Sequence, residues 1–369
     1  MSNIPIFDLK GEIELLKSDF LTSISNVLDS GKFILGDEVQ RFEQQVAEYL
    51  GVKYAVGVNS GTDALIIALR AIGVKKGDEV ITTPFTFFAT VEAIELIGAT
   101  PILVDIDIND FNIDVVEIEK SITAKTTAIL PVHIFGHPAN MDEIIAIANK
   151  YNLKIVEDVA QAFGAKIAER KVGTFGNVGC FSFFPTKNLG AYGDGGLIVT
   201  NEFEVAEVAK KLRVHGGKDK YSNELFGYNS RLDEIQAAIL NIKLKYLDEW
   251  NSKRKNVADL YCKKLKDISS IKLPIEKANC NHVYHQFTIR VLEENRDDLY
   301  QYLLDNGVQS MIYYSKPIHK LPVYNELYSN LSFPVSELAS KQVLSLPIWP
   351  HITESQIEIV CGLIKKYFS

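Results

Sequence analysis

The chain has 369 residues, a length that predicts about two domains, since a single hydrophobic core seldom grows this large. Its composition, 47% hydrophobic and 23% charged, is that of an ordinary water-soluble protein. The formal charge of −8 argues against a general nucleic-acid-binding protein, which would present a basic face.

The N-terminal segment and the cysteines indicate the expected compartment. Residues 1–8 lack a positively charged stretch followed by an apolar one, so they do not resemble a secretory signal peptide, and no apolar run reaches membrane-spanning length. The cysteines lie far apart, which favours reduced thiols over disulfides or a zinc site, and the histidines show no metal-binding spacing. We therefore expect a cytoplasmic protein without a bound metal or a membrane partner.

The first two-thirds of the chain alternates short apolar runs with amphipathic segments. We expect strands at 54–58, 79–82, 100–105, 128–132, 154–158, 178–184 and 196–200. We expect helices between them, at 62–72, 87–97 and 141–151 among others. This alternation predicts βαβ units and a mostly parallel sheet that is covered on both faces. Ligands of such sheets bind beyond the carboxyl ends of the strands, so the segments after the strands are the places to look for chemistry.

The last third of the chain has a different pattern. Residues 232–265 form one long, charge-rich helical stretch, which we interpret as the connection to a smaller domain. That domain is expected to hold a strand near 285–291 and helices at 296–306 and 354–367. The prediction is a large domain at 1–245 and a smaller α+β domain at 246–369.

Lys187 is the residue whose setting demands an explanation. It lies in a turn and glycine-rich segment between the apolar runs 178–184 and 196–200. A cationic side chain between two buried strands is costly unless something there uses it. Desolvation disfavours the charged ammonium and frees the amine as a nucleophile, which Schiff-base chemistry requires. The alternative is a lysine at the rim of the sheet that extends its amine to water.

Two segments are suited to bind a phosphate group. Gly61 and Thr62 open the helix expected after the strand at 54–58, where free backbone N–H groups, the close approach that glycine permits and a hydroxyl make an anion site. Ser182 precedes Lys187 and offers a second hydroxyl. The alternative for 59–64 is an ordinary helix N-cap.

Two further strand ends carry groups that suit a planar ring. Within 83–90, Phe88 is the aromatic residue expected to stack on such a ring, although aromatic residues there also serve as core. Asp158 ends the strand at 154–158, where a carboxylate is costly unless it caps a helix or meets a partner such as a protonated pyridine nitrogen. Gln161 follows one turn later and can reach the ring's phenolic oxygen. Together with Lys187 and the phosphate groups, these features predict a pyridoxal phosphate site.

The chain also resembles the DegT/DnrJ/StrS family of sugar-nucleotide aminotransferases over essentially its whole length. The motifs that carry the resemblance are Asn59-Ser-Gly-Thr-Asp-Ala-Leu65, Glu157-Asp-Val-Ala-Gln-Ala162, Ser182-Phe-Phe-Pro-Thr-Lys187 and Gly227-Tyr-Asn-Ser-Arg-Leu-Asp-Glu-Ile-Gln-Ala237. The resemblance implies the aspartate-aminotransferase-like fold type I, with a mostly parallel seven-stranded sheet in an α/β large domain.

The resemblance implies a role for each residue of the expected cofactor site. Lys187 would form the Schiff base with the cofactor and Asp158 would pair with its ring nitrogen. The phosphate would be held by Gly61, Thr62 and Ser182, the ring would be contacted by Phe88 and Gln161, and Asn229 would reach the phosphate of the neighbouring subunit's cofactor. The active site is therefore expected in a homodimer.

The activity that the resemblance implies is transamination of a nucleotide-linked keto-sugar, with glutamate as the amino donor and Lys187 as the proton shuttle. The expected substrate is a dTDP-linked 3-keto-6-deoxyhexose, used in deoxyaminosugar biosynthesis for glycans or natural products. A 4-keto-sugar aminotransferase and a non-catalytic, cofactor-binding regulatory relative are the alternatives. Related dehydratases carry histidine at the position of Lys187, so the lysine favours transamination.

Substrate contacts are expected from residues around this site, each of which could instead be structural. Phe183 lies beside the active-site strand and lacks the hydroxyl that a tyrosine would offer the sugar. The other candidates are His215, Gln309, Ser310, Tyr314 and His319.

Overall fold

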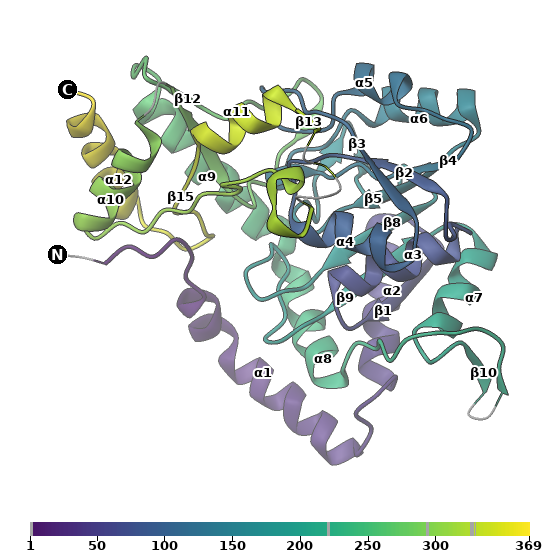
Figure 1. Cartoon of the computed structure of the whole chain (residues 1–369). Helices are drawn as coiled ribbons and strands as arrows, with labels where there is room; N and C mark the ends of the chain where they lie inside the picture. The colour runs from purple at the N-terminus through teal and green to yellow at the C-terminus, as the bar shows by residue number, and fades with distance from the viewer. Residues whose placement is uncertain (1–2, 220–221, 293–294, 325–327, 329) are drawn as a thin grey trace.

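The computed structural model describes residues 3–219, 222–292, 295–324, 328 and 330–369 (Figure 1). A seven-stranded sheet forms its centre, in the order β1-β9-β8-β5-β4-β2-β3. The strands are β1 (Tyr54–Val58), β2 (Glu79–Thr82), β3 (Thr100–Leu103), β4 (Thr126–Ile129), β5 (Lys154–Asp158), β8 (Val178–Ser182) and β9 (Gly196–Thr200).

All strands of this sheet except β9 run in the same direction. β9 is antiparallel to both β1 and β8, whereas the other neighbouring pairs are parallel. The mostly parallel α/β sheet predicted from the sequence is therefore confirmed. Its consequence is that the carboxyl ends of β1, β8, β5 and β2 meet at one edge.

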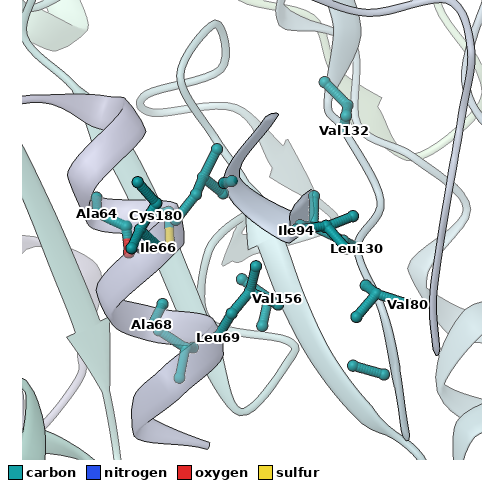
Figure 2. Close-up of a cluster of buried hydrophobic side chains, with 14 of the residues drawn as sticks. Ala64, Ile66, Ala68, Leu69, Val80, Ile94, Leu130, Val132, Val156 and Cys180 are labelled. Carbon is teal, nitrogen blue, oxygen red and sulfur yellow. Dashed lines mark hydrogen bonds between the residues drawn. The ribbon is translucent and has the colours of Figure 1, made fainter. Parts of the chain in front are cut away.

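One face of the sheet is covered by α3 (Gly61–Ala71), α4 (Phe88–Leu96) and α7 (Phe203–Leu212). Figure 2 shows Ile66 and Leu69 of α3 and Ile94 of α4 among the apolar side chains of the strands. Val156 of β5 points to this face, and its neighbour Ile155 belongs to the cluster on the other face, as the two-residue period of a strand requires.

The opposite face is covered in two parts. Near β1, β8 and β9 lie α2 (Asp37–Leu50) and α8 (Glu234–Lys243), whereas α5 (Val115–Lys120) and α6 (Met141–Tyr151) cover the part near β2, β4 and β5. α1 (Lys10–Ser30) packs against α8. Around the sheet lie the short strands β6 (Lys166–Ile167), β7 (Arg170–Lys171), β10 (Gly217–Asp219), β11 (Ser222–Asn223) and β13 (Cys280–Asn281).

A second core is built by the C-terminal third. It is formed around a three-stranded antiparallel sheet, β12 (Ile271–Lys272), β14 (Phe287–Val291) and β15 (Val343–Leu346), with α9 (Leu247–Leu265), α10 (Arg296–Asp305), α11 (Pro334–Gln342) and α12 (Glu354–Tyr367). Ile4 from the start of the chain is fully buried in this core, where its backbone N–H donates to Gly307 and its carbonyl accepts from Gln309.

The helical stretch predicted at 232–265 differs from the structure. α8 ends at Lys243, a 3₁₀ turn spans Leu244–Tyr246, and α9 begins at Leu247. The stretch contains no glycine or proline, so no local signal marks the break. The break arises because α8 packs on α1 and α2, whereas α9 packs on α12. The domain boundary expected at residue 245 falls in this turn and stays a prediction.

Two further findings concern the described residues only. No helix among them is long and apolar enough to cross a membrane. They contain no cluster of three or more histidine, cysteine, aspartate or glutamate side chains able to hold a metal ion.

Candidate active site

A cavity of about 340 Å³ opens at the sheet edge where the carboxyl ends of β1, β2, β5 and β8 meet. The cavity is lined by the segment that follows each of these strands. Residues 285–286, just before β14, and residues 313–314 also line it. Of the residues predicted for the cofactor, the cavity brings together Gly61, Thr62, Asp158, Gln161, Ser182 and Lys187. The sheet therefore assembles groups that are up to 126 positions apart (from 61 to 187) in the sequence.

The start of α3 forms a narrow anion cradle at one end of the cavity. The Ser60 hydroxyl accepts from the Asp63 N–H over 3.1 Å, which caps the helix. The first N–H groups of the helix have no acceptor within it, so they are available to an anion. A Cβ added to Gly61 would lie 2.7 Å from Ser182 Cβ, so only glycine fits beside that serine.

Asp158 is a buried carboxylate at the end of β5. Its Oδ2 accepts from the Thr90 hydroxyl over 2.9 Å, and its Oδ1 accepts from the Ala160 N–H over 3.1 Å. Burial raises the pKa of Asp158, and the two hydrogen bonds and the nearby Lys187 and His133 act in the opposite direction. A cation placed against this carboxylate would therefore stabilise its ionised form.

Lys187 follows β8 and faces the same cavity. Its amine makes no hydrogen bond or ion pair to the residues that the structure describes, although the side chain keeps some surface toward the cavity. Burial lowers the pKa of Lys187 to about 8, with Asp158 acting in the opposite direction. At neutral pH an appreciable fraction of this amine is thus unprotonated and nucleophilic, as Schiff-base formation requires.

The side-chain amide of Gln161 is held in one orientation. Its Oε1 accepts from the Phe135 N–H over 2.6 Å, and its Nε2 donates to the Tyr314 hydroxyl over 2.9 Å. Tyr314 lines the cavity as well, so it is the one residue of the six predicted substrate contacts that the structure places there.

For two predicted aromatic residues, Phe88 and Phe183, the structure places the neighbouring residue in the cavity instead. Phe88 is the first residue of α4 and packs on Tyr324, with ring centroids 6.1 Å apart, whereas Phe87 lines the cavity and is 61% exposed. Phe183 is fully buried with its ring 5.2 Å from that of Phe42, and Phe184, 50% exposed, faces the cavity instead. Phe87 is the N-cap of α4 and Phe88 its first residue, so the start of the helix decides which ring faces the cavity. Phe183 and Phe184 directly follow β8, where successive side chains point to opposite sides.

The remaining predicted substrate residues lie outside the cavity. Ser310 is buried, and the Gln309 side chain accepts from the backbone N–H of Ile6 over 3.4 Å. His319 pairs with Glu337 over 3.0 Å against the ring of Phe333. His215 has its backbone N–H bonded to Tyr228 in the segment beside β10. None of these four residues lines the cavity, and their role as substrate contacts stays a prediction.

Asn229, predicted to reach the cofactor of a neighbouring subunit, does not line the cavity of its own chain. It is exposed and forms an isolated bridge with Val214. Its role toward a second chain stays a prediction.

The sequence analysis missed several residues that line the cavity. Thr86 and Thr90 share a hydrogen bond of 2.9 Å, and because the Thr90 proton goes to Asp158, Thr86 is the donor of that pair. Thr86 and Thr90 are four residues apart, a spacing that places two side chains on the same side of a helix start. That spacing is the feature of the sequence that could have indicated their contact. His285 and Gln286 come from the C-terminal third, and nothing in the local sequence connects them with Lys187.

Comparison with known proteins gives consistent results. The model of the DegT/DnrJ/EryC1/StrS aminotransferase family matches residues 14–365. A pleiotropic regulatory protein of Geobacillus stearothermophilus is 45% identical, over 99% of both chains. The dTDP-3-amino-3,4,6-trideoxy-alpha-D-glucose transaminase of Streptomyces venezuelae is 43% identical, over 99% of this chain and 96% of that one.

Two further similar proteins are a UDP-sugar aminotransferase and a protein of known crystal structure. A UDP-N-acetyl-3-dehydro-alpha-D-glucosamine 3-aminotransferase of Acidithiobacillus ferrooxidans is 43% identical, over 98% of this chain and 97% of that one. The crystal structure of DesV from S. venezuelae, in complex with a ketimine intermediate, superposes with a TM-score of 0.97 at 42% identity and covers 100% of this chain and 99% of that one. The chain therefore belongs to the DegT/DnrJ/EryC1/StrS family and is a pyridoxal-phosphate-dependent aminotransferase of the fold type I class.

Proposed function

We propose that this aminotransferase moves the amino group of glutamate to C-3 of a dTDP-linked 3-keto-6-deoxyhexose, acting in the cytoplasm. The observation that carries the proposal is the cavity in which Lys187 and Asp158 lie together with the start of α3. The choice of sugar is supported by the relative that acts as a dTDP-3-amino sugar transaminase at 43% identity.

The residues of the cavity fit pyridoxal phosphate, which when bound supplies an aldehyde carbon for amines and a ring that withdraws electrons. The N–H groups at Gly61 and Thr62 and the Ser182 hydroxyl would hold its phosphate, because these groups form the anion cradle. Asp158 would pair with the ring nitrogen, and Phe87 would cover a ring face.

Lys187 would bond to the cofactor aldehyde through Nζ and, once released, carry protons between carbon atoms of the reactants. A base and acid at one position is most effective when its pKa lies near the working pH. The pKa of about 8 for Lys187 meets this condition, whereas an exposed lysine would stay protonated.

The homodimer expected from the sequence remains part of the proposal. Asn229 is exposed and does not line its own cavity, which suits a contact with a second chain. Apolar side chains of α1, Leu15, Leu21 and Leu28, are also exposed in the single chain. Surfaces of this kind are typical of protein–protein contacts.

Three alternatives remain, two for the substrate and one for the class of protein. The relative that acts on a UDP-linked sugar makes a different nucleotide the first alternative, and a 4-keto-sugar is the second. A non-catalytic, cofactor-binding regulatory protein is the third, and one relative bears the name pleiotropic regulatory protein. Lys187 in the cavity favours catalysis over that role, because the amine is positioned and unpaired.

The test uses the purified, cofactor-loaded protein with glutamate and a panel of dTDP- and UDP-linked 3-keto and 4-keto sugars. We expect glutamate to bleach the cofactor's absorbance and product NMR to show an amino group at C-3 of the dTDP-linked sugar. Lys187→Ala should abolish turnover, whereas Lys272→Ala, an exposed lysine on β12, should not. An absorbance that no amino acid changes would contradict catalysis, and amination at C-4 or only of UDP-sugars would contradict the proposed substrate.

A further inference from the structure

His285 borders the cavity from the C-terminal third of the chain and is 8% exposed. A series of side-chain amides extends behind it into the protein. His285 Nδ1 lies 3.1 Å from Asn188 Oδ1, and Asn188 is the residue next to Lys187. Asn188 in turn bonds to Asn251 on α9. The series therefore joins the active-site loop, α9 and the segment before β14.

Backbone carbonyls at the end of the series fix the direction of every hydrogen bond in it. The carbonyl of Phe163 can only accept, so Asn251 Nδ2, at 3.0 Å, is the donor there and Asn251 Oδ1 is left as an acceptor. Asn188 Nδ2 donates to that oxygen over 2.8 Å and to the carbonyl of Val283 over 3.0 Å. The atom of Asn188 that faces His285 is thus an oxygen.

It follows that His285 donates from Nδ1. An oxygen of an amide cannot donate, so the hydrogen between Asn188 and His285 belongs to the ring. Burial, with the positive charges of Lys187 and Arg254, lowers the pKa of His285 well below its usual value. The ring is therefore neutral, and its Nε2 carries a lone pair.

The packing leaves this series little freedom. Asn251 lies against Gly164, whose φ is +90°, and a Cβ at Gly164 would be 2.6 Å from Asn251 Nδ2. Asn188 and Asn251 are both buried. No partner for His285 Nε2 occurs within the portion of the chain that the structure describes, and the ring lines the cavity beside Lys187.

We propose that His285 is a substrate-binding residue whose Nε2 accepts a hydrogen bond from an O–H or N–H group of the reactant in the cavity, with Asn188 and Asn251 as the positioning residues that fix its tautomer. The donor is a hydroxyl of the sugar or the ammonium group of the amino donor. The inference rests on the proposed function for the identity of these reactants, but the tautomer does not depend on them.

The tautomer is tested in the cofactor-loaded protein by NMR of ¹⁵N-labelled histidine, with the His285 signals assigned by their loss in His285→Phe. We expect a protonated Nδ1 and an unprotonated Nε2 at neutral pH, and an Nε2 signal that moves when the reactant binds. Asn188→Leu should redistribute the tautomers. A protonated Nε2, or protonation of both nitrogens, in the wild-type protein would overturn the proposal.

The binding role is tested by measuring the glutamate and sugar half-reactions separately in His285→Phe. A site that loses one hydrogen bond weakens by roughly tenfold, so we expect KM to rise by about that factor in one half-reaction. A rise for glutamate identifies the ammonium as the donor, and a rise for the sugar identifies a hydroxyl. Unchanged KM values, or a lower kcat alone in both half-reactions, would overturn the proposal.

Thr288→Val is the matched control, because it removes a buried hydrogen bond of 2.8 Å between Thr288 on β14 and Ser345 on β15, away from this cavity. It should leave the KM of both half-reactions unchanged. If the wild-type protein accepts none of the nucleotide keto-sugars, the proposed function is wrong. The NMR test of the His285 tautomer does not depend on that outcome.

Discussion

Thr90 donates its hydroxyl proton to Asp158 Oδ2 over 2.9 Å, and valine in its place keeps the shape of the side chain but removes the donor. Both residues are buried, so water does not replace the lost hydrogen bond. The bond lowers the pKa of a carboxyl group whose pKa burial raises. Thr90→Val therefore raises that pKa further, and the carboxylate becomes protonated at a higher pH.

The expected loss of cofactor affinity follows from the hydrogen bonds that Asp158 accepts. A hydrogen bond that ends on a charged group contributes about 1.5–3 kcal/mol, and about 1.4 kcal/mol corresponds to a factor of ten in an equilibrium constant. The Ala160 N–H still holds Oδ1 in the variant, which favours the lower end of the range. We expect cofactor affinity to fall roughly tenfold.

The assay is a titration of the apoprotein with pyridoxal phosphate, followed by the pH profile of the glutamate half-reaction. Because a protonated Asp158 no longer pairs with the ring nitrogen, the acid side of the profile should move to higher pH in Thr90→Val. Thr82→Val is the control, since it removes a buried hydroxyl that bonds the Leu130 carbonyl over 2.9 Å outside the cavity. Unchanged affinity and an unmoved profile in Thr90→Val would refute the role of this hydrogen bond.

Three other outcomes are expected. With its pKa of about 8, Lys187 gains its neutral amine as pH rises through 8. The rate at which the apoprotein captures pyridoxal phosphate should therefore climb between about pH 7 and about pH 9 and level off above, and a flat stopped-flow profile would contradict this. Gly61→Ala should weaken cofactor binding in the same titration because its Cβ would meet Ser182, whereas Gly362→Ala on α12, with nothing within 4 Å, should not. Glu157→Gln should lower the free energy of unfolding, measured in urea, by about 3 kcal/mol. The reason is that the buried Glu157 carboxylate accepts hydrogen bonds from His133 and from the backbone N–H groups of Gly173, Phe175 and Gly176. An unchanged midpoint of the urea unfolding curve would argue against that network.

The parts of the fold that the sequence predicts are those set by local periodicity. The bounds of β5 and α6 agree with the expectation, because an apolar run ends at Asp158 and an amphipathic repeat ends at Tyr151. The order of the strands brings Gly61, Asp158 and Lys187 to one edge, so strand-end reasoning was sufficient to gather them.

The remainder of the site depends on information that the local sequence lacks. The choice between Phe87 and Phe88 depends on the residue at which α4 begins, and helix starts are poorly determined by sequence. His285 meets Asn188 across 97 positions of the chain, a contact that only the packing of α9 against both segments creates. Gln309 was predicted as a substrate contact, yet its side chain accepts a hydrogen bond from Ile6, in the N-terminal segment that contains Ile4.

That segment also bears on the order in which the chain can be completed. Ile4 fills the C-terminal core and its backbone bonds to residues 307 and 309, so the segment around Ile4 cannot dock until residues about 300 positions later have been synthesised. During synthesis the sheet around β5 can form before this core closes, since domains fold largely in the order in which they emerge. Docking of the segment around Ile4 is therefore a late step of folding, and it joins residues from opposite parts of the sequence in one core.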